Sequence, residues 1–101
     1  AEVAHQVRQL AEALIRHGIS AGNKVFIAAE NRPEWAIADL AVMAIGGIAV
    51  PSFITNTEDD FAYIMDHSES VMAITSGGSL AQSVLNAAGT AGVKTIMVMP
   101  R

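Results

Sequence analysis

The chain has 101 residues, of which 51% are hydrophobic and only 16% are charged, and it carries a net charge of −4 and no cysteine. Nucleic-acid binders carry a basic patch, and disulfide scaffolds and thiolate metal sites need cysteines, so the composition speaks against all three classes. The longest uncharged run is interrupted by two glycines and a proline, so no transmembrane helix is predicted. We expect a cytoplasmic protein that is at most peripheral at a membrane.

The first half of the chain contains a helix followed by a strand–helix–strand unit. Residues 2–17 repeat apolar side chains at helical spacing, namely Val3, Val7, Leu10, Leu14 and Ile15. The apolar runs 24–29 and 48–51 predict strands, and Asn31–Ile45 predicts the helix between them, with a proline in its first turn. This helix is apolar on almost every side, so we expect it to be buried on more than one face, with Trp35 as a core anchor.

The second half of the chain predicts two further helices and two further strands. Thr57 is a helix N-cap, and the carboxylates of residues 58–60 fill the first turn, where they complement the helix dipole. We expect the inner face of this helix to consist of Phe61, Ile64 and Met65. Residues 71–75 and 94–99 predict strands, and residues 80–88 predict a helix between them. We expect the inner face of that helix to consist of Leu80, Val84 and Leu85.

The predicted order α-βα-βα-βα-β, with strands that hardly alternate between apolar and polar, indicates an α/β fold with a three-layer parallel sheet of the Rossmann or flavodoxin-like kind. Ligands of such sheets bind at the carboxyl ends of the strands. Here this rim contains Glu30–Asn31, Ser52–Thr55 and Thr75–Gly78. Charged residues make up 16% of the chain, whereas they make up about a quarter of a typical globular domain. This low share indicates a piece of a larger protein.

Two stretches at or near this rim invite a functional interpretation, and each has a structural one. The loop Thr75–Ser79 joins a strand to a helix whose N-terminus would attract an anion, but it lacks the P-loop pattern and is first of all an ordinary turn. The acidic residues 58–60 point in different directions around a helix, so capping explains them better than a metal site. The histidines form no ligand or nucleophile motif, so no catalytic residue and no metal site is predicted.

A resemblance to a known family covers essentially the whole chain. Gly18-Ile-Ser-Ala-Gly-Asn-Lys-Val25, Glu30-Asn-Arg-Pro-Glu-Trp35, Gly46-Gly-Ile-Ala-Val-Pro51, Thr55-Asn-Thr57 and Tyr63-Ile-Met-Asp-His-Ser68 stand in the order that adenylate-forming, AMP-binding enzymes have near their N-terminus. The match is best with acyl-CoA synthetases of the fatty-acid–CoA ligase type. The resemblance implies that residues 1–101 are a single partial domain, an excised subdomain of a larger N-terminal domain.

The resemblance also implies a parent enzyme that uses ATP, Mg²⁺ and coenzyme A to convert a carboxylic acid, a fatty acid by the closest resemblance, into its coenzyme A thioester. The family's phosphate loop and catalytic lysine are absent from residues 1–101, so the chain alone should hold no cofactor and be inactive. Its partners would be the rest of the parent chain and the acid substrate, and its exposed apolar surface would allow self-association.

A coenzyme A contact is the one binding role that the resemblance suggests for this stretch. In acetyl-CoA-type relatives, residues just after the strand that matches 48–51 touch the coenzyme A nucleotide, and the matching positions here include Phe53 and Thr55. The aromatic residue is kept, whereas the family's glycines and arginine are not. The alternative from a different class is a free-standing, flavodoxin-like phosphate- or nucleotide-binding module that uses the loop Thr75–Ser79.

Overall fold

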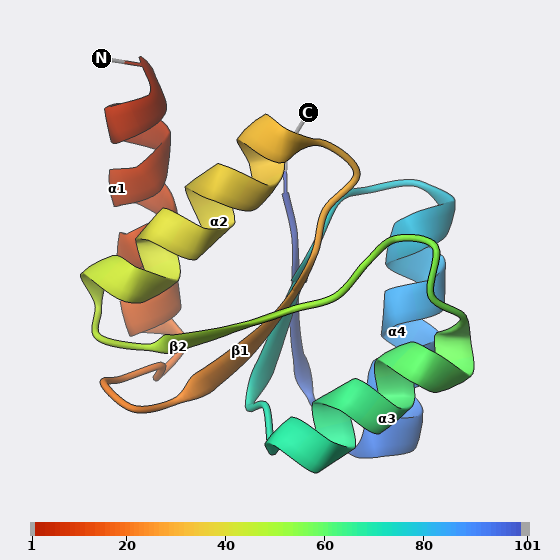
Figure 1. Ribbon diagram of the computed structural model, residues 1–101. Coiled ribbons are helices and arrows are strands. Elements are labelled where there is room, and N and C mark those ends of the chain that lie inside the picture. Colours follow the sequence, from red (N-terminus) through yellow and green to blue (C-terminus); the bar gives the residue numbers. More distant parts are fainter. Residues whose placement is uncertain (1, 100–101) are drawn as a thin grey trace.

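The computed structural model describes residues 2–99, within which four helices alternate with four strands (Figure 1). The elements are α1 (Glu2–Arg16), β1 (Lys24–Ala28), α2 (Arg32–Ala44), β2 (Ile48–Pro51), α3 (Glu58–Ser68), β3 (Met72–Thr75), α4 (Ser79–Ala91) and β4 (Thr95–Val98). This confirms the predicted order. The clearest boundary difference lies in α4, which continues through Gly89 and ends at Ala91. Gly92 follows as the C-cap, and its φ of 82° suits a left-handed cap.

The four strands form one parallel sheet in the order β2-β1-β3-β4. The central strands are almost entirely buried, whereas the edge strands β2 and β4 are half-buried or exposed along their length. After β2 the chain crosses to the other side of β1, so the strand order reverses between β1 and β3. Ligands of doubly wound sheets bind at such a switch point.

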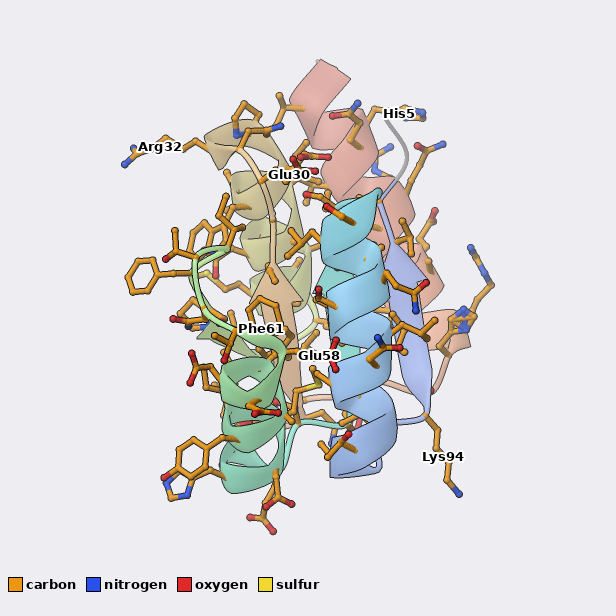
Figure 2. The ribbon with its side chains drawn as sticks, turned by 90° about the vertical axis from the view of Figure 1, so that its right-hand side faces the viewer. His5, Glu30, Arg32, Glu58, Phe61 and Lys94 are labelled. Carbon is orange, nitrogen blue, oxygen red and sulfur yellow. The ribbon has the colours of Figure 1, made fainter. Side chains whose placement is uncertain are left out.

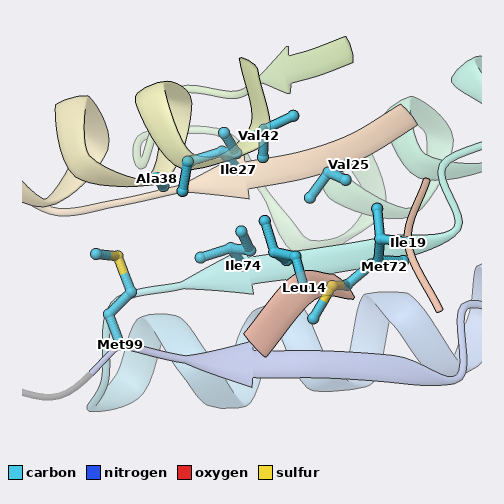
Figure 3. Close-up of a cluster of buried hydrophobic side chains, with 10 residues drawn as sticks. Leu14, Ile19, Val25, Ile27, Ala38, Val42, Met72, Ile74 and Met99 are labelled. Atoms are coloured by element: carbon cyan, nitrogen blue, oxygen red, sulfur yellow. The ribbon is translucent and has the colours of Figure 1, made fainter. Parts of the chain in front are cut away.

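Helices α1 and α2 cover one face of the sheet and helices α3 and α4 cover the other, so the predicted three-layer arrangement is confirmed (Figure 1). Alternate strand residues face opposite layers. Val25 and Ile27 join Leu14 of α1 and Val42 of α2 in one core cluster (Figure 3). On the opposite face, Phe26 meets Phe61 of α3 edge to face, with ring centroids 5.7 Å apart.

The helical spacing over residues 2–17 implies one apolar face that includes Val3 and Ile15, and Leu85 was predicted on the inner face of α4. All three predictions are wrong, because these residues are 53%, 59% and 51% exposed. In α1, contact with the core begins only one turn after Val3, and Ile15 lies beside rather than within the buried stripe. In α4 the buried face consists of Val84, Ala87 and Ala88, because small alanines let the helix approach the sheet closely. Leu85 therefore points away from the core.

Helix α2 is buried on one side only, which corrects the prediction of burial on several sides. Its buried residues are Ala38, Ala41 and Val42, whereas Leu40 and Met43 are 46% and 60% exposed. Trp35, predicted as a core anchor, is half-buried and packs against the core at its margin. Among the described helices, none combines the length and apolar character that crossing a bilayer requires.

Candidate functional site

The rim at the carboxyl ends of the strands is the candidate site. Glu30 follows β1, Ser52 follows β2 and Ser76 follows β3, so the three stretches that the sequence assigns to this rim do lie at the same end of the sheet. Figure 2 shows Glu30 at this end, with Arg32 extending away from the molecule nearby.

A hydrogen-bond network closes the switch point between β1 and β3. The Ser76 Oγ donates to Glu34 Oε1 over 3.0 Å and accepts from the Glu30 backbone N–H over 2.8 Å. Glu34 Oε1 also accepts from Asn31 Nδ2 over 2.7 Å, and the Glu34 N–H donates to Asn31 Oδ1 over 2.9 Å. Asn31 is thus the N-cap of α2, and one carboxylate joins this cap to the end of β3.

This network engages the side chains at the start of the loop after β3, which limits their availability for chemistry. The side chains of Thr75 and Ser76 are fully buried, and the Thr75 hydroxyl donates to the Ser76 carbonyl oxygen over 3.0 Å. The Ser76 hydroxyl already donates one hydrogen bond and accepts another, so it is held as a structural group and is not presented as a nucleophile. Gly78, at the N-cap of α4, has φ 76° and provides no side-chain cap.

The larger of two grooves at the rim, of about 720 Å³, lies between α1, the start of α2 and the end of β4. Its apolar lining includes Leu10, Ile37 and Met97, and its polar lining includes Gln9 and Glu34. This groove is not predicted from the sequence. No local pattern would have revealed it, because it depends on where α1 settles relative to α2 and β4.

A second groove of about 650 Å³ lies between the start of α2 and the loop after β2. Its lining includes Arg32 and Trp35 of α2 together with Pro51, Phe53 and Ile54. Phe53, a predicted coenzyme A contact, lines this groove and is 77% exposed. It therefore offers a ring face to a ligand at low desolvation cost.

Thr55, the other predicted contact, is exposed in the turn that follows Phe53 and does not line the groove. The turn is held by its neighbours: the Asn56 N–H donates to the Phe53 carbonyl oxygen over 3.1 Å, and Asn56 Nδ2 donates to Ser52 Oγ over 3.0 Å. The Ser52 N–H in turn donates to the Ile27 carbonyl oxygen over 3.0 Å, which fixes the start of the loop to the sheet. Phe53 thus projects from a tethered loop.

The acidic residues at the start of α3 form a helix cap, as predicted. The Asp60 N–H donates to Thr57 Oγ1 over 3.2 Å, and the Thr57 N–H donates to Asp60 Oδ2 over 3.0 Å, which is a complete capping box. Glu58 accepts a hydrogen bond from Asn86 Nδ2 over 3.1 Å and so links α3 to α4. Within residues 2–99, no three His, Asp or Glu side chains gather closely enough to hold a metal ion.

Comparison with known proteins gives consistent matches over almost the entire chain. Long-chain-fatty-acid–CoA ligase FadD15 of Mycobacterium tuberculosis is 36% identical over 90 residues, which are 89% of this chain and 15% of FadD15. Fatty acyl-CoA synthetase A of Dictyostelium discoideum is 28% identical over 92 residues, which are 91% of this chain and 14% of that protein. The chain therefore spans only about one seventh of the length of these relatives.

Solved structures agree with the sequence matches. A benzoate CoA ligase from Burkholderia xenovorans LB400 superposes with a TM-score of 0.87 at 25% identity, over 98% of this chain and 20% of that enzyme. The family model described as AMP-binding enzyme matches residues 1–100. The chain belongs to the AMP-binding enzyme family.

Proposed function

We propose that this chain is a partial domain of an ATP-dependent acyl-CoA ligase that acts on a carboxylic acid, and specifically on a fatty acid. In the reaction that the family membership implies, the carboxylate attacks the α-phosphorus of ATP and releases pyrophosphate. The coenzyme A thiol then attacks the acyl-adenylate, which gives the thioester and AMP. The observation that carries this proposal is the 36% identity to a fatty-acid–CoA ligase over 89% of the chain.

The role of these residues in such an enzyme would be to build and brace the sheet, since neither the phosphate loop nor the catalytic lysine lies among them. The Asn31–Glu34–Ser76 network supports this role, because it ties the start of α2 to the ends of two strands. Mg²⁺ accompanies ATP in this chemistry, but residues 2–99 gather no donor set for it, so we assign the ion to none of them. The isolated chain should therefore catalyse neither step.

Exposed apolar residues support the view of a partial domain. Leu40 and Met43 of α2, Ile48 of β2 and Ile54 after it are each 46% to 60% exposed. Because α2 and β2 are in contact, these four residues lie on neighbouring elements, which suits a surface that further protein covers. We propose that the rest of the parent chain covers it, and that the isolated chain self-associates or aggregates without that cover. Such a parent would be a cytoplasmic enzyme, at most peripheral at a membrane.

We further propose that Phe53 contacts the adenine of coenzyme A and that Thr55 lies beside the same ligand. Phe53 has an exposed ring on a tethered loop, and Arg32 lines the same groove, so an aromatic ring and a guanidinium are both available to a nucleotide with phosphates. Thr55 would offer a hydroxyl from the following turn.

The coenzyme A contact is tested in a FadD15 hybrid, which we define as FadD15 with the segment that matches this chain replaced by this chain. Because aromatic stacking on a base contributes about 1 kcal/mol or more, Phe53→Ala should raise the KM for coenzyme A about fivefold or more and leave the KM for ATP unchanged. Tyr63→Ala is the matched control, since Tyr63 is an aromatic residue of α3 with 66% exposure. An unchanged KM for coenzyme A in Phe53→Ala would contradict the assignment.

The ligase proposal itself is tested with the same hybrid and with the isolated chain. The hybrid should form acyl-CoA from a fatty acid, ATP and coenzyme A, whereas the isolated chain should show no fatty-acid-dependent exchange of pyrophosphate into ATP. A folded hybrid without activity, or an isolated chain with activity, would contradict the proposal.

The alternative of a free-standing phosphate- or nucleotide-binding module has less support. An anion at the loop Thr75–Ser79 would lie close to the Glu34 carboxylate, which is 3.0 Å from Ser76 Oγ and would repel it. This loop also contains no lysine or arginine. NMR titration of the isolated chain with inorganic phosphate distinguishes the two proposals, because saturable shifts in Gly77, Gly78 and Ser79 would favour the module.

A further inference from the structure

The positive charge of the chain is distributed unevenly, and one arginine stands apart from the rest. Residues 33–93 contain neither lysine nor arginine. Lys24 begins β1 and Lys94 precedes β4, so both lie at the amino ends of the strands, and Figure 2 shows Lys94 at the opposite end of the molecule from Arg32. Among the lysines and arginines of residues 2–99, Arg32 alone lines either groove at the carboxyl rim.

The charge of Arg32 has no partner in the fold that residues 2–99 form. Arg32 is the first residue of α2, where the positive end of the helix dipole disfavours a cation. Its side chain is exposed, extends away from the molecule (Figure 2), and forms no hydrogen bond or ion pair within these residues. An anionic ligand would be attracted by the guanidinium and by the positive end of the helix together.

The groove that Arg32 lines restricts where such an anion can bind. Phe53, whose side chain is 77% exposed, and Trp35 line the same groove and offer aromatic rings. The carboxylate of Glu30 lines it too and would repel a phosphate placed at the end of β1. A phosphate would therefore bind on the outer side of the groove, toward which Arg32 extends (Figure 2).

Coenzyme A offers two kinds of phosphate to such a site. Its adenosine carries a 5′-diphosphate, which continues into the pantetheine arm and the reacting thiol, and a terminal 3′-phosphate monoester. The monoester carries close to two negative charges at neutral pH, because the second pKa of a phosphate monoester is about 6. With adenine stacked on Phe53, the diphosphate has to direct the thiol toward the acyl group, whereas the monoester is free to point outward to Arg32.

We propose that Arg32 binds the 3′-phosphate of coenzyme A and thereby makes the ligase prefer coenzyme A over 3′-dephospho-coenzyme A. This inference rests on the proposed function. The planar guanidinium can donate two parallel hydrogen bonds to two phosphate oxygens, and such bonds are stronger than those between neutral groups. The first turn of α2 holds Arg32 in place, since the Asn31 side chain caps the helix and Glu34 accepts a hydrogen bond from Ser76.

Kinetics of the FadD15 hybrid with the two thiol substrates test this specificity. Arg32→Ala should raise the KM for coenzyme A about tenfold and leave the KM for 3′-dephospho-coenzyme A and for ATP unchanged within about twofold. Arg32→Lys keeps the charge without the paired donors and should give an intermediate KM. Arg16→Ala is the matched control, because Arg16 is an exposed arginine that lines neither groove. The proposal is wrong if Arg32→Ala and Arg16→Ala give the same ratio of the two KM values.

Two further readouts separate a phosphate contact from a role in folding. Salt screens an exposed ion pair, so the difference in KM between Arg32→Ala and the unmodified hybrid should shrink as potassium chloride rises from about 0.05 to about 0.5 M. The Tm of Arg32→Ala should not fall, because the side chain has no partner within residues 2–99 and the helix dipole disfavours its charge. A difference that is independent of salt, or a fall in Tm, would contradict the proposal.

Equilibrium binding keeps this proposal distinct from the ligase proposal. Isothermal titration of the hybrid with coenzyme A and with 3′-dephospho-coenzyme A measures the same preference without turnover. A folded hybrid that forms no acyl-CoA but loses its preference on Arg32→Ala would contradict the ligase function and support the phosphate contact. An active hybrid that shows no preference, or that keeps its preference in Arg32→Ala, would support the ligase function and overturn the contact.

Discussion

Removing the Ser76 hydroxyl should destabilise the chain more than its single atom suggests. Ser76 is fully buried at the switch point, where its Oγ donates to Glu34 Oε1 and accepts from the Glu30 N–H. Ser76→Ala removes both hydrogen bonds and replaces the hydroxyl with a hydrogen of nearly the same position, so packing changes little. The expected loss therefore comes from the two polar groups that lose a partner.

The magnitude follows from the surroundings of these two groups. The hydrogen bond to the Glu30 N–H contributes about 1 kcal/mol. A hydrogen bond to a carboxylate is worth more when buried, but Glu34 is half-exposed and keeps its bond from Asn31 Nδ2, so we take about 1 kcal/mol for it as well. The free energy of unfolding should fall by about 2 kcal/mol, which lowers Tm by about 10 °C for a domain of this size.

Urea and thermal unfolding followed by circular dichroism measure this loss in the isolated chain, at dilutions at which light scattering finds the monomer. Ser79→Ala is the matched control, because Ser79 is an exposed serine of the same loop region and its loss should change stability by less than about 0.5 kcal/mol. Glu34→Gln keeps an oxygen acceptor for Ser76 and should cost less than Ser76→Ala. The reasoning is refuted if Ser76→Ala unfolds like the unmodified chain or like Ser79→Ala.

Three further predictions concern single positions of known geometry. At Gly89, inside α4, an added Cβ would meet nothing within 4 Å, so Gly89→Ala should raise the unfolding free energy by about 0.5–1 kcal/mol. At Gly47 an added Cβ would lie 2.9 Å from Val42 Cγ1, so Gly47→Ala should lower the unfolding free energy by about 1–3 kcal/mol. Urea unfolding of both variants measures the two effects, and equal effects would contradict this reasoning. Asn31→Ala removes the side chain that caps α2 and should lower the unfolding free energy by about 1 kcal/mol. Asn31→Ser keeps a capping oxygen and should lose much less. Equal stability of the two variants in thermal unfolding would argue against the cap.

The order of elements and the layers could be predicted from the sequence because the signals are local. Pro33 and the Asn31 cap mark the start of α2, and the capping box at Thr57 marks the start of α3. Which residues of a helix face the sheet was harder to predict, because a large apolar side chain was expected to be buried. In α4 the larger Leu85 is exposed, and the small Ala88 faces the sheet. Propensity and periodicity locate a helix but do not fix its rotation against a neighbour.

The candidate site was predictable only as a region. The rim followed from the strand ends, and Phe53 was named because a family resemblance pointed to it. That Ser76 would join Glu34, 42 residues earlier in the chain, depends on the pairing of β1 with β3, which no local pattern encodes. For the same reason the sequence did not reveal the groove between α1, α2 and β4, because three separate elements create it.

The strand order has a consequence for how the chain folds. Ala49 pairs with Val25 from 24 residues away, and Thr95 pairs with Met72 from 23, whereas Met72 follows its partner Val25 by 47 residues. Each outer pair is thus closed by a short crossover, and the longest loop closure joins the two halves at the centre of the sheet, with a larger entropy cost. As the chain emerges from the ribosome, β1 and β2 can form their ladder first, and the other hydrogen-bonding edge of β1 remains open until β3 arrives.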